Sequence, residues 1–124
     1  MIQTKNFNPI SDPKLLCTCG HILCDKRSVK QEALDKVQLI RDDVDRGMIV
    51  TSGGRCPYHP DEVHRTTPAD HQKCIVLDVK VSGGVQRMEM VTLGLKYGAT
   101  AIGVAKTFVH LGWRENAPLV MWVY

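Results

Sequence analysis

The sequence has no long apolar run, no basic tract and no low-complexity segment. Its longest apolar runs are only a few residues, so we expect no transmembrane helix and no insertion into a membrane. Residues 1–8 hold no apolar stretch of the signal-peptide kind, so we expect no secretion signal. Lys and Arg never form a run of three and the net charge is +3, which argues against a nucleic-acid partner.

The length and composition are those of one folded domain. The chain has 124 residues, of which 44% are hydrophobic and 23% charged, so it can build a core and is too apolar for a disordered chain. We expect a single domain over residues 1–124. Its first part, residues 1–27, is expected to be irregular because Pro9, Pro13 and Gly20 interrupt it.

Hydrophobic periodicity predicts two main helices and several short strands. The clearest helix begins at Ser28, a favourable N-cap residue, and carries apolar residues at spacings of three and four up to residue 46. A second helix is expected over residues 85–97, with Val85, Met88, Val91 and Leu95 on its apolar face. Short runs rich in apolar and β-branched residues predict strands at 48–52, 74–79, 100–104, 107–111 and 119–124. This order predicts an α+β domain with a small, mainly antiparallel sheet.

Five cysteines and five histidines give a high density of metal-ligating side chains. An odd number of cysteines cannot pair completely, and without a secretion signal we expect reduced thiols. Cys17, Cys19, His21 and Cys24 are candidate ligands of a structural zinc ion, and Cys56 is a further candidate. Buried thiols without a metal are the alternative, because Cys-x-Cys is not the usual spacing of a zinc knuckle. A disulfide between this stretch and Cys56, formed in an oxidising space, is a third.

Three further features carry polar side chains that could serve a reaction. Residues 52–59, Ser-Gly-Gly-Arg-Cys-Pro-Tyr-His, are the end of a predicted strand followed by two glycines and an arginine. His71 and Asp78 stand seven residues apart at the entry to the next strand, and His110 lies on a short apolar strand. Each feature alone has an ordinary interpretation: a solvated loop arginine, a chance pair and a packed histidine.

In this order along the chain, the three features resemble those of the zinc D-alanyl-D-alanine carboxypeptidase family, which includes phage murein endopeptidases. Residues 48–59, Met-Ile-Val-Thr-Ser-Gly-Gly-Arg-Cys-Pro-Tyr-His, are similar to the family's strand and Ser-Gly-Tyr-Arg-Cys block. His71 and Asp78 match the family's His-x6-Asp pair, and residues 108–110 resemble the strand that bears the last ligand. The resemblance covers most of the chain and is closest to short, single-domain, phage-type members.

The resemblance implies a hedgehog/DD-peptidase-like fold and a catalytic zinc ion bound by His71, Asp78 and His110. These side chains supply two nitrogen donors and one oxygen donor. A catalytic zinc ion takes three such ligands and keeps a fourth position open for water. The donor set therefore agrees with the resemblance.

The resemblance also assigns Arg55 to the catalytic site. Its guanidinium would bind a carboxylate or a carbonyl of the substrate, because the planar fork suits the end of a peptide. Ser52 and His59 lie close to Arg55 in the sequence and are candidate substrate-binding residues.

The sequence departs from the family at the residue that serves as general base and acid. Relatives carry a carboxylate two residues after the last histidine or three before it, which works as general base and acid. The corresponding residues here are Gly112 and Thr107. Glu115 and Asp70 are the nearby acids that could replace it, and Glu115 is the nearest one downstream.

These implications lead to zinc-dependent hydrolysis of peptide bonds in the peptidoglycan stem or cross-link, at a D-Ala-containing or an L-Ala–D-Glu bond. The partners would be peptidoglycan stem peptides and, for a virion-borne protein, other phage tail proteins. A phage-encoded enzyme without a secretion signal would stay in the host cytoplasm until lysis or be packed in the virion, and would act at the bacterial cell wall. The alternative is a catalytically impaired, zinc-stabilised structural or wall-binding component of a phage tail or virion. A third interpretation, a small domain with coincidental histidines, predicts no bound metal.

Overall fold

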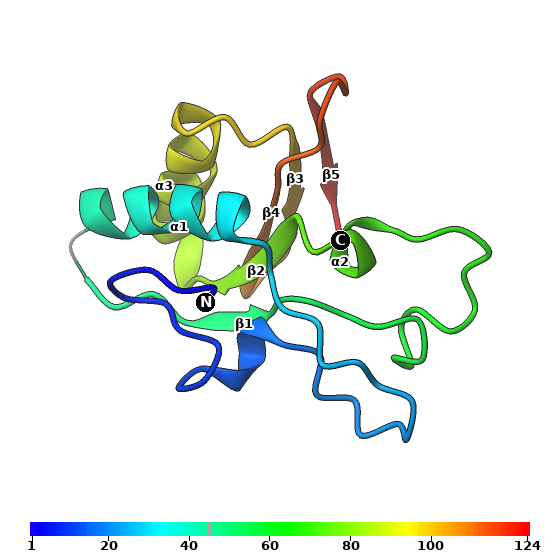
Figure 1. The fold of residues 1–124 in the computed structure, drawn as a ribbon. Helices are drawn as coiled ribbons and strands as arrows, with labels where there is room; N and C mark the ends of the chain where they lie inside the picture. Colours follow the sequence, from blue (N-terminus) through cyan, green and yellow to red (C-terminus); the bar gives the residue numbers. More distant parts are fainter. Residues whose placement is uncertain (45) are drawn as a thin grey trace.

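A five-stranded sheet forms the centre of the computed structural model, which describes residues 1–44 and 46–124 (Figure 1). Its strands are β1 (Val50–Ser52), β2 (Val76–Lys80), β3 (Ala101–Val104), β4 (Phe108–Gly112) and β5 (Val120–Val123). They lie in the order β1-β2-β4-β3-β5, and all neighbours are antiparallel except β3 and β5. Each predicted strand is present, although most are shorter than expected, and the prediction of an α+β, mainly antiparallel fold is confirmed.

Two main helices, α1 (Gln31–Val44) and α3 (Gly83–Lys96), lie together on one side of the sheet (Figure 1). The other side carries the short helix α2 (Asp70–Lys73) and the long loops around it. A short 3-10 helix, η1 (Pro13–Leu15), contacts β1. No helix in the described part of the chain combines the length and the apolar content needed to cross a bilayer.

The first helix starts later than its sequence predicts. It begins at Gln31 rather than at Ser28. The N–H of Lys30, just before the helix, donates to the Cys74 carbonyl at 2.9 Å, so a hydrogen bond to a distant segment holds this stretch. The Ser28 hydroxyl donates to the Val29 carbonyl and caps no helix N–H. Tertiary contacts therefore override the local capping signal.

Helix α3 packs through a different face from the one that its apolar spacing predicts. Met90 and Gly94 are buried. Of the predicted apolar face, Val85, Met88 and Leu95 are exposed, and Val91 is partly buried against the core. A Cβ on Gly94 would lie 2.6 Å from Leu111 Cδ2. The glycine therefore permits the close approach of α3 to β4, and this approach decides which face is covered.

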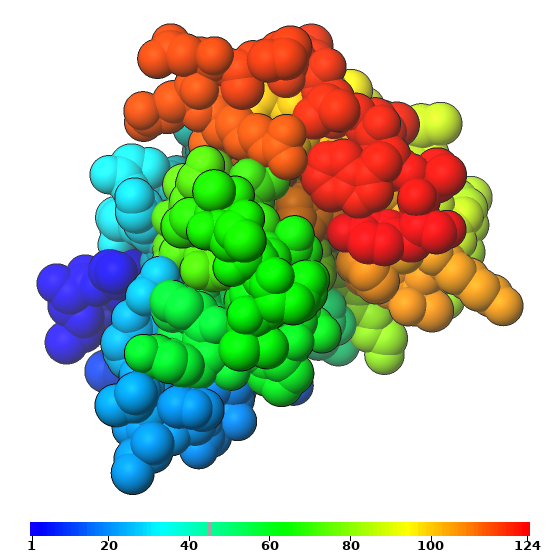
Figure 2. All heavy atoms as spheres, turned by 90° about the vertical axis from the view of Figure 1, so that its right-hand side faces the viewer, coloured from blue at the N-terminus to red at the C-terminus, as the bar shows by residue number. Residues whose placement is uncertain are grey.

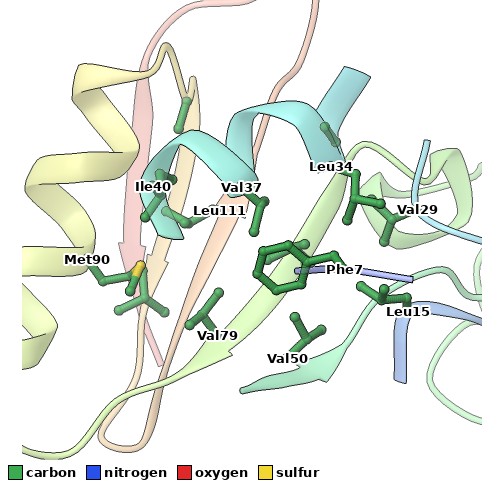
Figure 3. Packing of buried hydrophobic residues seen from close by; sticks show 14 of the residues in the cluster. Phe7, Leu15, Val29, Leu34, Val37, Ile40, Val50, Val79, Met90 and Leu111 are labelled. Atoms are coloured by element: carbon green, nitrogen blue, oxygen red, sulfur yellow. The ribbon is translucent and has the colours of Figure 1, made fainter. Parts of the chain in front are cut away.

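Apolar side chains between the helices and the sheet form the core (Figure 3). Helix α1 contributes Leu34, Val37 and Ile40, which are fully buried. In Figure 3 they lie toward the strands that carry Val79 and Leu111. Burial of one such side chain stabilises a fold by roughly 1.5–3 kcal/mol. The sheet is thus held rigidly from one side, and its other face is available for polar residues.

The N-terminal segment is irregular, as expected, but it is anchored at several points. Phe7 and Leu15 are buried in the same core as the helices (Figure 3). Leu16 pairs with Ser28 in a single antiparallel bridge. The chain between these two residues forms a loop that contains three of the five cysteines.

Candidate metal centre

One residue from each strand contributes to a row across the sheet. The register pairs Ser52 with Asp78, Asp78 with His110, His110 with Gly103, and Gly103 with Trp122. Successive side chains of a strand point to opposite faces, and the residues that flank Asp78 and His110 belong to the core under the helices. The row therefore lies on the face of the sheet that the helices leave free.

Gly103 allows the aromatic end of this row to approach the histidine. A Cβ at this position would lie 2.6 Å from Trp122 Nε1, so only glycine accommodates the indole here. The Trp122 ring lies 5.0 Å from the His110 ring, measured between centroids. The indole thereby fixes one side of the His110 imidazole.

His71 reaches the same place from helix α2. Its Nδ1 lies 2.7 Å from the Gly53 carbonyl oxygen, which can only accept a hydrogen bond. The proton of a neutral His71 is therefore on Nδ1, and the lone pair is on Nε2, 3.6 Å from Asp78 Oδ2. A histidine ligand held by a backbone carbonyl through its other nitrogen is the usual arrangement in metal sites.

Helix α2 ends at Cys74, which has the left-handed conformation at φ 62° and leads the chain toward β2.

His110 completes the group from strand β4. Its Nδ1 lies 3.0 Å from Asp78 Oδ1, and its ring lies 5.1 Å from that of His71, nearly perpendicular to it. His110 Nε2 is buried, lies 3.9 Å from Asp70 Oδ2 and has no hydrogen-bond partner among the described residues. A buried polar atom without a partner is costly, so it points to a group that the protein atoms do not supply.

The pKa values show how strongly these side chains interact. Burial would raise the pKa of Asp78, but the hydrogen bonds and charges of His110 and His71 outweigh burial and lower it to about 2. Burial would lower the pKa of His110, but its contacts with Asp70 and Asp78 raise it. Asp78 is thus ionised at neutral pH, and its negative oxygens face two imidazoles in a buried site.

This donor set fits a zinc ion. His71, Asp78 and His110 are all buried, and one potential ligand atom from each lies within 4.8 Å of the other two. Two nitrogens and one carboxylate oxygen are the ligands of catalytic zinc sites that keep a fourth position for water or substrate. The structure therefore brings together the three residues that the sequence predicts as ligands.

Asp70 lies directly beside this group. Arg114 binds its carboxylate through Nε, at 3.0 and 2.9 Å from the two oxygens, and through Nη2 at 2.8 Å. Burial would raise the pKa of Asp70, but its contacts with His110 and Arg114 hold the pKa well below its usual range. Asp70 is therefore an ionised carboxylate with a fixed orientation, and its Oδ2 lies 3.9 Å from His110 Nε2.

The three ligand candidates line a cleft of about 630 Å³. Its walls include the segment from Pro60 to Arg65 on one side and Trp122 and Tyr124 on the other. In Figure 2 the green atoms of the first wall and the red atoms of the C-terminal strand lie side by side on this face of the molecule. The cleft is large enough for part of a peptide and small for a folded partner.

Arg55 also lines this cleft, and Ser52 and the buried Glu62 hold its guanidinium. Its Nη2 donates to the Ser52 hydroxyl at 3.0 Å, and its Nη1 lies 3.5 Å from Glu62 Oε2. Its Nε is buried and has no partner in the described part of the chain. Ser52 thus orients Arg55 at the wall of the cleft.

A larger hollow of about 1040 Å³ lies next to the cleft. Asp70 and Arg114 contribute to both, but none of the three ligand candidates lines the larger one. We place the site in the smaller cleft because the buried histidines and the ionised Asp78 are there. Glu115, a predicted catalytic candidate, is exposed and lines the larger hollow, so the structure does not bring it to the metal ligands.

Other residues of the site differ from the sequence-based expectation. His59 does not line the cleft, whereas His64 does. Burial and the charge of Arg55 lower the pKa of His59. Glu62 also lines the cleft, although no local pattern distinguishes it from the neighbouring acid Asp61 in this polar loop. It is buried and binds Gln72 at 3.3 Å as well as Arg55.

A second group of potential ligands lies outside the cleft. Cys17, Cys19, Cys24 and Cys56 each offer a sulfur atom within 4.8 Å of the other three. His21, a predicted member, is not part of this group. Its ring instead stacks on Tyr58, with centroids 4.5 Å apart.

Comparison with known protein families identifies a relationship that covers most of the chain. A model of the Peptidase M15 family matches residues 10–112, which include the four cysteines and all three predicted zinc ligands. A search of curated proteins finds no match to the chain. The matched range begins before the cysteine loop and ends at the last residue of β4.

Proposed function

Because the chain belongs to the Peptidase M15 family, we propose that it is a zinc-dependent peptidase that hydrolyses peptide bonds in the stem or cross-link of peptidoglycan. The observation that carries this proposal is the convergence of His71, Asp78 and His110 at the bottom of a cleft. The peptidoglycan substrate is inferred from the resemblance of the sequence to murein peptidases. The bond would be a D-Ala-containing bond or the L-Ala–D-Glu bond.

The protein contributes a buried, oriented set of ligands. Asp78 supplies a carboxylate oxygen, and His71 and His110 supply imidazole nitrogens. The Gly53 carbonyl fixes the tautomer of His71, and Trp122 limits the rotation of His110. The chemistry that a bound zinc ion supplies is activation of a water molecule and polarisation of a carbonyl group.

Arg55 would orient the substrate in the cleft. Its charge is partly balanced by Glu62 and Asp61, and the guanidinium would bind a carboxylate or carbonyl oxygen of a substrate in the cleft that it lines. A guanidinium held by Ser52 loses little conformational freedom when it binds a ligand. The side chains of Trp122 and Tyr124 would form the opposite, apolar wall.

Asp70 is the acid that we assign to proton transfer. Hydrolysis of a peptide bond needs a group that removes a proton from water and gives one to the leaving amine. Asp70 lines the cleft and lies against His110, whereas Thr107 and Gly112 carry no carboxylate. Its ion pair with Arg114 keeps the carboxylate oriented.

Digestion of purified peptidoglycan tests the proposal. The wild-type protein, supplied with zinc, is expected to release fragments with new amino termini, detected by mass spectrometry. A chelator should abolish this release, and added zinc should restore it. The variant Asp78→Asn should be inactive, whereas Asp43→Asn should cut like the wild type, because Asp43 is on α1 and binds Lys96 far from the cleft. Cutting that survives chelation, or that persists in Asp78→Asn, would refute the metal mechanism.

One observation favours a second candidate function, a zinc-stabilised wall-binding or structural protein without activity. The two positions at which relatives carry their catalytic carboxylate are Gly112 and Thr107, and Arg114 occupies Asp70. This candidate predicts binding of the protein to insoluble peptidoglycan with no fragments released over long incubation. Cosedimentation and mass spectrometry on the same sample separate the two candidates.

The resemblance to short phage-type members further leads us to infer that the protein is phage-encoded. It would then act as an endolysin, or as part of a virion next to other tail proteins. Mass spectrometry of purified virions tests the second location directly. Detection of the protein there at a constant ratio to tail proteins would support it, and its presence only in lysates would support the endolysin.

A further inference from the structure

Four of the five cysteines lie together although they come from two distant segments. Cys17, Cys19 and Cys24 belong to the loop between Leu16 and Ser28, and Cys56 directly follows Arg55. All four sulfur atoms lie within 4.8 Å of one another, and those of Cys19 and Cys56 are 3.6 Å apart. In Figure 2 the light-blue atoms of the loop lie against the green atoms of the Cys56 segment.

These sulfur distances suit a metal ion better than disulfides. Four thiolates at about 2.3 Å from one zinc ion lie about 3.8 Å from one another in a tetrahedron. Two disulfides would need only two short contacts, with sulfurs about 2.05 Å apart, and would not bring all four atoms together. Four sulfur atoms that all lie within 4.8 Å of one another form the pattern that a single shared metal ion requires.

We propose that Cys17, Cys19, Cys24 and Cys56 bind a structural zinc ion, separate from the candidate metal centre in the cleft. Four protein ligands fill the tetrahedral coordination of zinc and leave no position for water, so the site is closed and has no catalytic role. His21 is not a ligand, because its ring stacks on Tyr58 and its Nδ1 accepts the Leu23 N–H at 3.0 Å.

The backbone of the loop is shaped around the sulfur atoms. The Lys26 N–H donates to Cys24 Sγ at 3.4 Å, and Lys26 has the left-handed conformation, at φ 53°. The Cys24 N–H donates to the His21 carbonyl at 2.9 Å, which closes a turn. An N–H group that points at a metal-bound sulfur balances the negative charge of a thiolate, as second-shell donors do in metal sites.

The loop lacks the apolar contacts that would hold it without a metal. Ile22 and Leu23 are 93% and 60% exposed, so the apolar side chains at its tip contribute nothing to the core. A segment that buries so little apolar surface cannot offset the entropy of ordering its backbone. Metal binding supplies folding free energy in such cases, as in small zinc-binding domains.

The position of Cys56 connects this site to the cleft. Arg55 precedes Cys56, and the Arg55 N–H donates to the His71 carbonyl at 3.1 Å. A zinc ion bound by Cys56 would therefore hold the backbone of Arg55 against helix α2. The role is one of positioning, so its loss should weaken substrate binding more than the rate of the bound substrate.

Cysteine variants with a matched control test this site. The full-length protein is purified without chelators, and zinc is measured by elemental analysis. We expect about two zinc ions per chain in the wild type and about one in Cys19→Ser. Cys74→Ser is the control, because the Cys74 thiol is buried alone and lies 3.6 Å from the Gln72 carbonyl; it should keep the wild-type content. His71→Ala should lose the other ion and keep the one bound by cysteines.

Cobalt substitution tests the site in the wild-type protein, so the result does not require a cysteine variant to fold. Wild-type protein loaded with Co²⁺ should show the intense thiolate-to-cobalt absorption of a tetrahedral sulfur site, which nitrogen and oxygen ligands cannot produce. His71→Ala should keep this absorption and Cys19→Ser should lose it. Unchanged zinc in Cys19→Ser, or an intact mass that shows disulfides in the native protein, would overturn the proposal. If the peptidase proposal failed because the cleft binds no zinc, the total zinc content would fall by one ion. The loss of one zinc ion from wild type to Cys19→Ser and the cobalt absorption would remain, since these two results measure the cysteine site alone.

Discussion

The two candidate metal sites differ in what holds their ligands. In the cleft, Asp78 and His110 face each other across the paired strands β2 and β4, and a packed core supports those strands from the other side. The cysteines instead lie in loops, and the only regular pairing near them is the bridge between Leu16 and Ser28 in the described part of the chain.

The cleft site is therefore formed by the fold itself, whereas the cysteine site would become ordered only when a metal binds. Strand register sets the distance between Asp78 and His110 before any ion binds, so the cleft site is preorganised. The cysteine loop has exposed apolar residues at its tip and depends on its ligands for order. Loss of the ion should therefore remove chemistry in the first case and local structure in the second.

The largest expected effect comes from removal of a ligand in the cleft. His110→Ala should reduce hydrolysis of peptidoglycan to the uncatalysed level and remove one zinc ion, while the cysteine site keeps its own. The matched control is His64→Ala, an exposed histidine that lines the same cleft. Elemental analysis and fragment release are measured together. Equal activity of the two variants would contradict the assignment of His110.

The next effect concerns proton transfer. Asp70→Asn should keep both metal ions but slow hydrolysis by about 10²–10⁴-fold, the usual contribution of general acid–base catalysis. Glu115→Gln, which changes an exposed acid outside the cleft, should have little effect. The measurement is the rate of fragment release at saturating peptidoglycan. If Asp70→Asn retained the wild-type rate, proton transfer would have to be assigned to another group.

A smaller effect tests the preorganisation of the sheet. Gly103→Ala places a methyl group 2.6 Å from Trp122 Nε1 and should displace the indole from His110. Overpacking of this kind costs about 1–3 kcal/mol of unfolding free energy. Gly84→Ala is the control: its Cβ would have only Arg87 Nη1 nearby, at 3.9 Å, and in helix α3 it should stabilise slightly. The free energies of unfolding of both variants are measured by denaturant titration. Equal values for the two variants would show that the Trp122 indole is not fixed against His110.

The smallest effect should appear in the cysteine loop. After removal of metal, trypsin should cut after Lys26 and Arg27 much faster than before, because the loop opens locally. Lys80, at the end of β2, serves as the internal control and should stay protected under the same conditions. Peptide mapping against time gives both rates. Equal protection of the loop with and without metal would mean that its own contacts are sufficient.

Local patterns in the sequence account for most of the elements of the fold. Short apolar and β-branched runs predict all five strands, because alternation and burial act within a few residues. The start of α1 and the buried face of α3 are predicted incorrectly. Both depend on distant partners: the Cys74 carbonyl before α1, and Leu111 under Gly94 of α3.

The candidate site divides in the same way. The sequence by itself determined which residue types are available and in what order, and the resemblance built on that order picks out His71, Asp78 and His110. Only the tertiary structure decided that Asp70 rather than Glu115 lies against the ligands, and that Cys56 rather than His21 joins the cysteines. The reason is physical: these choices depend on strand register and loop packing between residues far apart in the chain, which no local pattern encodes.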